Sequence, residues 1–275
     1  MTPAQALAAA MSLGLARIDG QLLLLEAMGR DQGDRAWLLS HDTDALPAPQ
    51  HARFLLLCAR RAGGEPLAYI VGRKEFFGLD LLVDRRVLVP RPDTETLVEW
   101  ALNVVGPTGR PRVVDLGCGS GAIALAIKKC LPAADMDATD ASAPALDVAR
   151  ENARRLSLAV QFRHGSWLDA AHGRYDLIVS NPPYIAADDS HLAALAHEPL
   201  GALASGPDGL ADIRAIVGQA PRHLRHAGWL LLEHGHDQAQ TVRGLLAAAG
   251  FRNVASRPDL AGIERCSGGQ WLELG

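Results

Sequence analysis

The sequence predicts an α/β fold: a seven-stranded, mostly parallel sheet that ends in an antiparallel hairpin, with a small helical bundle before it. Three observations lead to this prediction. Short apolar strands alternate with amphipathic helices from residue 112 onward, which is typical of a parallel sheet covered on both faces. Two strand-like segments at the end have no helix between them. The first 65 residues contain helical segments only.

Residues 1–70 are expected to form the helical domain. Its segments are rich in Ala and Leu or carry apolar residues at helical spacing, and they cover residues 3–15, 21–28, 35–40 and 49–61. Short polar connections between four short helices predict a bundle. The stretch has no chemical motif, so we interpret it as a domain for packing or for recognising a substrate.

Residues 71–90 are expected to be a β-hairpin linker between two domains. Residues 74–83 have an extended pattern, with Gly78 as a turn or bulge signal. The second domain is expected to cover residues 91–275. It begins with a helix that is capped by Asp93 or Thr94 and runs to about residue 105.

The second domain contains the alternating pattern. The predicted strands are 112–116, 135–140, 159–164, 175–180 and 228–234, and the predicted helices are 121–130, 144–156, 209–225 and 237–249. The last two predicted strands are 251–257 and 270–274, joined by a Gly- and Asp-rich loop. Because no helix separates these two, the final strand is expected to run antiparallel to its neighbour.

The composition narrows the class of protein. With 275 residues, 48% of them hydrophobic, the chain is long enough for about two packed domains. A net charge of −4 argues against a protein that grips a long nucleic acid duplex. The four cysteines are scattered and no apolar run is long enough to span a membrane. We therefore expect a cytoplasmic monomer with no disulfide framework, zinc site, membrane partner or stable nucleic-acid partner.

A glycine-rich turn follows the first strand of the second domain. Gly117-Cys118-Gly119-Ser120-Gly121 joins this strand to a helix, and glycines let the backbone turn tightly and approach a ligand at the helix N-terminus. Asp140 ends the next strand, where a carboxylate can accept both hydroxyls of a ribose. Gly117, Gly119 and Ala122 also satisfy the dinucleotide fingerprint. The turn therefore predicts a nucleoside-containing ligand.

Two details favour S-adenosylmethionine over a dinucleotide. Asp115 stands two residues before the first glycine, where it would meet the ammonium group of the ligand, directly or through water, and would repel a pyrophosphate. The antiparallel end of the sheet also departs from an all-parallel dinucleotide fold.

Asn181-Pro182-Pro183-Tyr184 follows the buried strand 175–180. The two prolines make a stiff extended segment without N–H donors, which leaves the Asn181 side-chain oxygen and the Pro182 carbonyl as acceptors. Such acceptors suit a planar –NH2 group, because two hydrogen bonds would orient this poor nucleophile and stabilise its developing positive charge. Tyr184 offers a ring that packs against the planar group.

These motifs together resemble those of the PrmC/HemK family of release factor glutamine methyltransferases. The resemblance runs from about residue 65 to the end of the chain, and the helical N-terminal segment is similar in length and kind. The further strings that carry it include Glu65-Pro66-Leu67-Ala68-Tyr69-Ile70, Val89-Pro90-Arg91-Pro92-Asp93-Thr94-Glu95, Glu198-Pro199 and Asp208-Gly209-Leu210. One departure is the pair His234 and His236, where relatives more often have Ile and Tyr.

The resemblance implies a Rossmann-like, class I S-adenosylmethionine-dependent methyltransferase. Such an enzyme transfers a methyl group to the glutamine side-chain amide in the Gly-Gly-Gln loop of class I peptide chain release factors and yields S-adenosylhomocysteine. It implies that residues 117–121 line the methionine part of the cofactor, that Asp140 holds its ribose and that Trp167 lies against its adenine. Asn181, Pro182, Pro183 and Tyr184 would bind the glutamine and form the catalytic site, with Asn181 also near the cofactor. Pro92, Thr94 and Glu95 resemble a segment that closes over the methionine end.

Two other functions share parts of this pattern. A DNA adenine or RNA guanine N-methyltransferase has a similar Asn-Pro-Pro-aromatic loop, but the chain has no basic target-recognition segment. A non-enzymatic cofactor-binding subunit would not need Asn181. The pairs His223/His226 and His234/His236 have no third ligand nearby, so no metal site is expected. Ser267-Gly268-Gly269-Gln270 contains the substrate tripeptide of the family, which we interpret as a hairpin turn.

Overall fold

The computed structural model describes residues 1–107 and 109–273. Contacts between residues divide the chain into two compact units, Met1–Arg73 and Lys74–Gly275.

The first unit is a bundle of short helices. It consists of α1 (Pro3–Ser12), α2 (Arg17–Ala27), α3 (Arg35–Ser40), α4 (Ala48–Ala62) and α5 (Leu67–Val71). Helix α2 lies at its centre and touches each of the other four helices. Leu23, Leu24 and Leu25 of α2 are all completely buried, because this part of the helix is surrounded by the other helices.

A small two-stranded hairpin begins at the boundary of the two units and consists of β1 (Arg73–Phe76) and β2 (Leu79–Leu82). The side chain of Asn152, fully buried in helix α8 (Ala143–Leu156), joins this hairpin to the rest of the unit. Its Oδ1 accepts a 2.7 Å hydrogen bond from the Leu82 N–H, and its Nδ2 donates to the carbonyls of Leu82 and Ser120 at 3.0 Å. The hairpin is therefore fixed to the turn that follows strand β3 (Arg112–Leu116).

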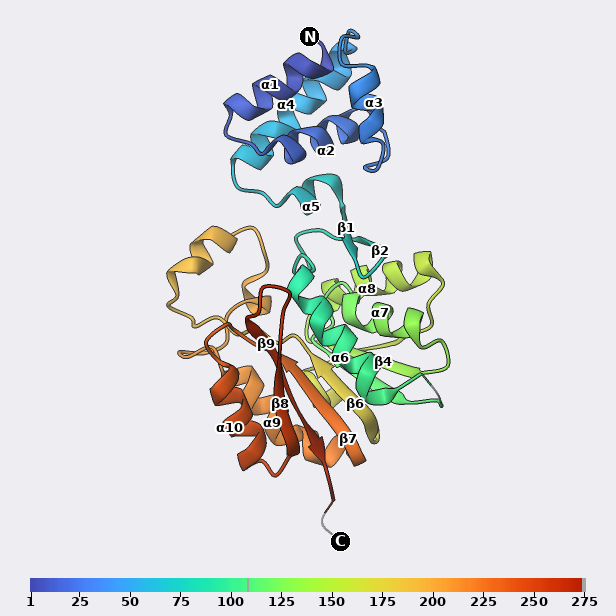
Figure 1. Cartoon of the computed structure of the whole chain (residues 1–275), viewed down its shortest axis with the longest axis vertical. Helices are drawn as coiled ribbons and strands as arrows, with labels where there is room; N and C mark the ends of the chain where they lie inside the picture. The colour runs from blue at the N-terminus through green and yellow to red at the C-terminus, as the bar shows by residue number, and fades with distance from the viewer. Residues whose placement is uncertain (108, 274–275) are drawn as a thin grey trace. The chain divides into compact units, whose positions relative to one another are not determined.

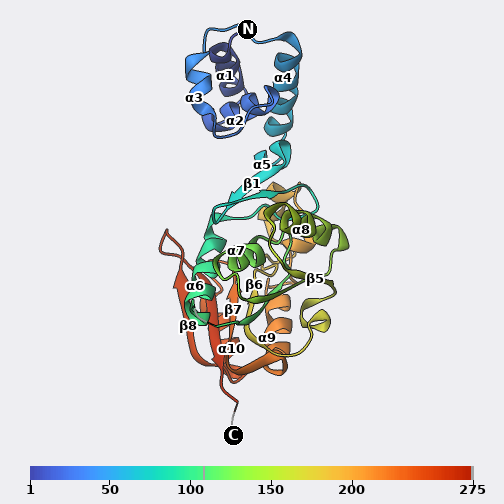
Figure 2. The same ribbon diagram turned by 90° about the vertical axis from the view of Figure 1, so that its right-hand side faces the viewer.

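A seven-stranded sheet forms the centre of the second unit (Figures 1 and 2). The strands lie in the order β5-β4-β3-β6-β7-β9-β8, and their bounds are β3 Arg112–Leu116, β4 Asp135–Asp140, β5 Gln161–His164, β6 Tyr175–Ser180, β7 Leu224–Glu233, β8 Arg252–Pro258 and β9 Glu264–Trp271. Strands β3 to β7 are parallel, whereas β9 is antiparallel to both of its neighbours. The predicted fold class is confirmed.

Helices cover both faces of this sheet, as Figure 1 shows. One face packs against α6 (Glu95–Val105), α7 (Ala122–Cys130) and α8, and the other against α9 (Ala211–His223) and α10 (Ala239–Ala248). Alternate residues of a strand enter the two cores: Val113 lies in the first and Val114 in the second, and both are fully buried. Strands buried on both faces explain the continuous apolar runs in the sequence.

The terminal hairpin differs from its prediction. The second strand was expected at residues 270–274, but β9 covers Glu264–Trp271, and residue 274 lies outside the described residues. The turn is short because Oδ1 of Asp259 accepts hydrogen bonds from the N–H groups of Ala261 and Ile263, at 2.8 and 3.0 Å. The predicted loop was therefore too long.

The reason for this error is a pair of glycines inside β9. Gly268 and Gly269 suggested a turn, but both lie in the strand. They are glycines because there is no room for a side chain at either position. A Cβ atom on Gly268 would lie 2.4 Å from Cδ2 of Leu231, and one on Gly269 would lie 2.8 Å from Cβ of Phe251. The interpretation of residues 267–270 as a hairpin turn was wrong.

Short 3₁₀ helices occupy several loops of the second unit. They are η1 (Pro92–Thr94), η2 (Trp167–Ala170), η3 (Ser190–Leu195) and η4 (Leu200–Ala202). Segment η1 directly precedes α6, η2 lies between β5 and β6, and η3 and η4 belong to the long connection between β6 and α9. These loops bring further residues to the carboxyl ends of the strands.

Candidate active site

The glycine-rich turn between β3 and α7 has a left-handed backbone at its three glycines. Gly117, Gly119 and Gly121 have φ angles of 68°, 54° and 82°, which other residues adopt only with strain. Gly117 and Gly119 line a cavity. Gly121 instead packs inward, because a Cβ atom there would lie 3.2 Å from Cδ1 of Leu125 and 3.3 Å from Cβ of Ala149.

The two residues between these glycines point away from the cavity. Cys118 and Ser120 are buried, and neither lines the cavity. The N–H of Cys118 donates a 3.0 Å hydrogen bond to the carbonyl of Thr139 in β4. Only the backbone of these two residues therefore contributes to the turn.

Asp140 ends β4 on the wall of the same cavity. Its Oδ2 accepts a 2.8 Å hydrogen bond from the Gly119 N–H, and its Oδ1 accepts one of 2.7 Å from the Ser142 N–H. Burial raises the pKa of Asp140 above its ordinary value, although these two bonds act to lower it. Each oxygen has a further lone pair, so the carboxylate can still accept bonds from a diol.

Trp167 begins η2, beyond the end of β5, and also lines the cavity. Its φ angle of 44° is unusual for a bulky residue. Its carbonyl accepts a 3.0 Å bond from the hydroxyl of Thr139. A Cβ atom on Gly117 would lie 3.0 Å from Cζ3 of the indole ring, so this ring lies against the glycine turn.

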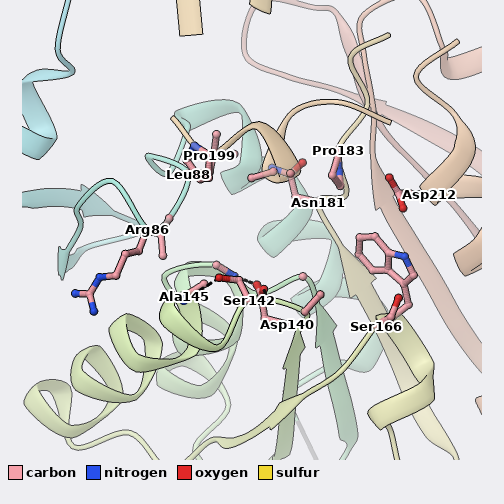
Figure 3. Close-up of a pocket in the computed structure, with 17 residues that line it drawn as sticks. Arg86, Leu88, Asp140, Ser142, Ala145, Ser166, Asn181, Pro183, Pro199 and Asp212 are labelled. Atoms are coloured by element: carbon pink, nitrogen blue, oxygen red, sulfur yellow. Dashed lines mark hydrogen bonds between the residues drawn. The ribbon is translucent and has the colours of Figure 1, made fainter. Parts of the chain in front are cut away.

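These residues line a cavity with a volume of about 490 Å³, which we call the larger cavity. Figure 3 shows Asp140 and Asn181 on facing sides of it. The residues that the sequence analysis missed are Arg86, Val87, Leu88, Ala141, Ser142, Ala145, Ser166, Pro199, Gly201, Ala202 and Asp212. Most of them come from loops far apart in the sequence, whereas Ala145 lies in α8 and Asp212 lies in α9.

Asn181-Pro182-Pro183-Tyr184 follows β6, as predicted, at the carboxyl edge of the sheet. Asn181 and Pro183 line the larger cavity, whereas Pro182 lies outside it and is buried. Nδ2 of Asn181 donates a 3.2 Å hydrogen bond to Oγ1 of Thr94 in η1. Its Oδ1 is then the atom left for a ligand.

A smaller cavity of about 420 Å³ lies beside the larger one. It is lined by Leu88, Arg91, Asn181, Tyr184, Ile185, Leu195, Glu198, Ala202 and Leu203. Three of these residues line both cavities: Leu88, Asn181 and Ala202. Asn181 therefore stands where the two cavities meet.

An ion pair ties the walls of the smaller cavity together. Arg91 donates to Oε1 of Glu198, whose side chain is only 3% exposed. Oε2 of Glu198 also accepts a 3.1 Å bond from the N–H of Val89. The segment before η1 and the connection after β6 are thereby held against each other.

Glu233 ends β7 behind this cavity, and the sequence analysis gave it no role. It is 1% exposed, and its Oε1 accepts a 3.5 Å bond from the hydroxyl of Tyr184. Burial raises the pKa of Glu233 to about 7, against hydrogen bonds from Thr94 and Tyr184 that lower it. Burial also raises the pKa of Tyr184, so its hydroxyl stays a donor at neutral pH.

Two other acidic residues do not lie where the sequence suggested. Asp115 is completely buried and does not line the larger cavity. Its Oδ2 accepts a 3.1 Å bond from the Ala124 N–H, and burial raises its pKa to about 8. Glu95 accepts a 2.9 Å bond from the N–H of Phe77 in the β1–β2 turn and lines neither cavity.

The predicted histidine pairs lie in different surroundings. His223 ends α9 and His226 lies in β7. His234 is buried and bonds Oγ of Ser267 through Nε2 at 2.8 Å. Across residues 1–107 and 109–273, no three His, Cys, Asp or Glu side chains are grouped to hold a metal ion. In the same ranges no helix combines the length and apolarity that crossing a membrane requires.

The chain is similar to known protein families in both units. Residues 95–202 match the methyltransferase small domain, and residues 4–72 match the PrmC N-terminal domain. A release factor glutamine methyltransferase of Bordetella pertussis is 51% identical, over 93% of this chain and 95% of that protein. One of Xylella fastidiosa is 48% identical, over 96% and 97%. A methyltransferase structure from Pyrococcus furiosus, 20% identical, aligns with a TM-score of 0.57 over 78% of this chain and 98% of that one.

Proposed function

This chain belongs to the family of release factor glutamine methyltransferases, and from that premise we propose that its two cavities bind S-adenosylmethionine and an acceptor glutamine. The chain is a methyltransferase that uses S-adenosylmethionine to modify a protein glutamine.

The larger cavity fits the cofactor in three respects. Gly119 faces open space, since a Cβ atom there would meet nothing within 4 Å, so a ligand can approach its backbone. Asp140 offers carboxylate lone pairs for ribose hydroxyls. The indole of Trp167 offers a flat apolar surface for the adenine. The cofactor supplies an electrophilic methyl group on a sulfonium when it is bound.

The smaller cavity then takes the glutamine side chain of the acceptor. The observation that carries this proposal is that Asn181 lines both cavities, because methyl transfer needs the acceptor nitrogen next to the cofactor. Tyr184 lines only the smaller cavity, where its ring can pack against the planar amide.

The chemistry asks for orientation rather than for a dedicated base. We propose that Oδ1 of Asn181 and the carbonyl of Pro182 accept the two N–H groups of the glutamine amide. These bonds hold the nitrogen in line with the methyl group and stabilise the positive charge that grows on it. The nitrogen lone pair forms the new N–C bond, the electron pair of the broken C–S bond stays on sulfur, and one N–H proton passes to solvent.

The acceptor that we propose is the glutamine of the Gly-Gly-Gln loop in class I peptide chain release factors. Support comes from curated relatives with the name release factor glutamine methyltransferase. This chain aligns with them over nearly their whole length. We propose further that residues 1–70 recognise this protein substrate. The match of residues 4–72 to the PrmC N-terminal domain supports a dedicated role for the unit.

Mass spectrometry of the release factor tests this function. The chain is incubated with S-adenosylmethionine and a purified class I release factor, and the Gly-Gly-Gln peptide is expected to gain one methyl group on the glutamine. A release factor with Asn in place of that glutamine is the matched control and should stay unmodified. Nucleic acid is added in a parallel reaction with labelled cofactor. Label in the nucleic acid alone would contradict the proposal.

A further inference from the structure

Asp212 places a carboxylate on the wall of the larger cavity. Among the described residues, three charged side chains line this cavity. Arg86 pairs with Asp84 at 2.6 Å, and Asp140 accepts hydrogen bonds from two backbone N–H groups. The half-buried carboxylate of Asp212 has no hydrogen bond and no ion pair within the described part of the chain. A ligand in the cavity can therefore become its partner.

Asp212 lies at the same end of the cavity as Trp167. Figure 3 shows Asp212 and Ser166 on one side of the cavity, and Ser166 directly precedes Trp167. The next residues along the chain, Ile213 and Leu168, are buried in the same hydrophobic core, against which Trp167 also packs. The carboxylate and the indole ring therefore border one end of the cavity together.

A side-chain hydrogen bond holds α9 against η2. Oε1 of Gln219 in α9 accepts a 3.2 Å bond from the N–H of Leu168 in η2. Gln219 follows Asp212 by seven residues, and residues at this spacing lie on the same face of a helix. The start of α9 is fixed as well, because Oγ of the buried Ser205 accepts the N–H of Asp212 at 2.9 Å. The face of α9 that contains Asp212 is thus turned toward η2.

S-adenosylmethionine has three kinds of group that can donate a hydrogen bond to a carboxylate. They are the ammonium group of its methionine part, the ribose hydroxyls and the N6 amino group of adenine. In the function proposed above, Asp140 accepts the ribose hydroxyls and Trp167 lies against the adenine. The ammonium group and the adenine are at opposite ends of the cofactor. The N6 amino group is therefore the donor that fits Asp212, beside Trp167.

We propose that Asp212 recognises the adenine of the cofactor by accepting a hydrogen bond from its N6 amino group. The proposal rests on the placement of S-adenosylmethionine in the larger cavity, and it does not depend on the identity of the acceptor. An ionised carboxylate only accepts hydrogen bonds. A purine without a donor at position 6 would leave this carboxylate desolvated and unpaired, so the site selects against such a base.

A purely structural role of Asp212 has a different signature. Asp212 lies in the first turn of α9, where a negative charge interacts favourably with the helix dipole. This interaction stabilises the folded chain, but it gives no preference between two purines that differ only at position 6. The decisive measurement is therefore a ratio of two affinities rather than a single affinity.

Binding of two product analogues to the full chain measures this ratio. Calorimetry gives the Kd of S-adenosylhomocysteine and of its 6-deamino analogue, in which a hydrogen atom replaces the N6 amino group. The unmodified chain is expected to bind the adenine compound at least about tenfold more tightly. Asp212→Ala should reduce this ratio to within about threefold, mainly by weakening the adenine compound. Asp212→Asn keeps a neutral acceptor and should give an intermediate ratio. An unchanged ratio in Asp212→Ala would overturn the proposal.

Asp208→Asn is the matched control for the loss of a carboxylate at the start of α9. Asp208 pairs with Arg214 at 2.6 Å and lines neither cavity, so this variant should keep the ratio of the unmodified chain. Circular dichroism establishes that all three variants fold. An equal loss of the ratio in Asp208→Asn and Asp212→Ala would mean that charge near α9 sets the preference, and would overturn the proposal. Because no acceptor protein is present, a failure of release factor methylation would contradict only the proposed acceptor.

Discussion

Gly117 lies against the indole ring of Trp167, and a Cβ atom on this glycine would lie 3.0 Å from Cζ3 of the ring. The glycine also has a φ angle of 68°, which disfavours any side chain. The turn after β3 and the loop after β5 therefore fit together only while position 117 has no side chain. The shape of the larger cavity therefore depends on the absence of a Cβ atom at position 117.

Gly117→Ala is expected to displace Trp167 and to weaken binding of S-adenosylmethionine by about tenfold or more. Titration calorimetry measures the affinity. Gly262→Ala is the matched control, because Gly262 is also left-handed, with φ 82°, but has nothing within 4 Å and lines neither cavity. If both variants lost affinity equally, backbone strain rather than contact with Trp167 would explain the effect.

The main expected effect of Asp140→Ala is weaker binding of the cofactor. The variant removes the acceptors for ribose hydroxyls and leaves the Gly119 and Ser142 N–H groups without their partner. A loss of about two hydrogen bonds to a charged group predicts a Kd at least about tenfold higher. Asp135→Asn, at the opposite end of β4, serves as the control. An unchanged Kd in Asp140→Ala would refute the assigned role.

Asn181→Ala is expected to remove most turnover while cofactor affinity falls less. Loss of one hydrogen bond that acts in the transition state costs about 10²–10³ in rate. Single-turnover measurements with the release factor give the rate, and calorimetry gives the cofactor affinity. A collapse of cofactor binding to the same degree would mean that Asn181 serves chiefly the cofactor. Undiminished transfer would contradict the proposed mechanism altogether.

Removal of residues 1–73 is expected to spare cofactor binding but to impair methylation of the intact release factor. The remaining unit contains both cavities and the whole seven-stranded sheet. Circular dichroism establishes that it folds, and calorimetry gives its affinity for S-adenosylmethionine. Activity on the release factor equal to that of the full chain would reject a recognition role for the helical unit.

Glu233 is expected to reduce the stability of the folded chain as the pH rises. Burial raises its pKa from 4.5 to about 7, so between these values the folded chain holds a proton that the unfolded chain has lost. The free energy of unfolding therefore decreases across this window, by up to about 3 kcal/mol. Urea unfolding should show Glu233→Gln gaining stability relative to the unmodified chain from about pH 5 to about pH 8. A constant difference would contradict the shift.

The sheet could be predicted from the sequence because each strand has a strong local pattern. Residues 112–116, 135–140 and 175–180 were predicted with the bounds that the structure has. The start of β7 was missed: the strand begins at Leu224, where its pairing with β6 is irregular and Ala227 has a φ angle of 64°. Such irregularity depends on the neighbouring strand and has no signature in the sequence.

Residues of the site could be predicted only where a short sequence motif indicates their chemical role. The glycine turn, Asp140 and Asn181 could be found because a motif predicts their place at a strand end. Which residues line the larger cavity could not be predicted, and Cys118, Ser120, Gly121 and Pro182 do not line it. Arg86 and Gly201 were missed because loops with no periodic pattern bring them to the cavity. Glu233 looked like the end of an ordinary strand.

Gly268-Gly269-Gln270 in β9 shows how this enzyme can coexist with its own target sequence. The backbone of these residues is paired with β7 on one side and β8 on the other. Nε2 of Gln270 donates to the carbonyl of Ala227 at 3.0 Å, and its Oε1 accepts from Nδ2 of Asn253 at 2.9 Å. The same three residue types that mark a substrate when they lie in an open loop are thus protected here by folding. The tripeptide in this strand is therefore expected to stay unmodified, although its residues match those of the target.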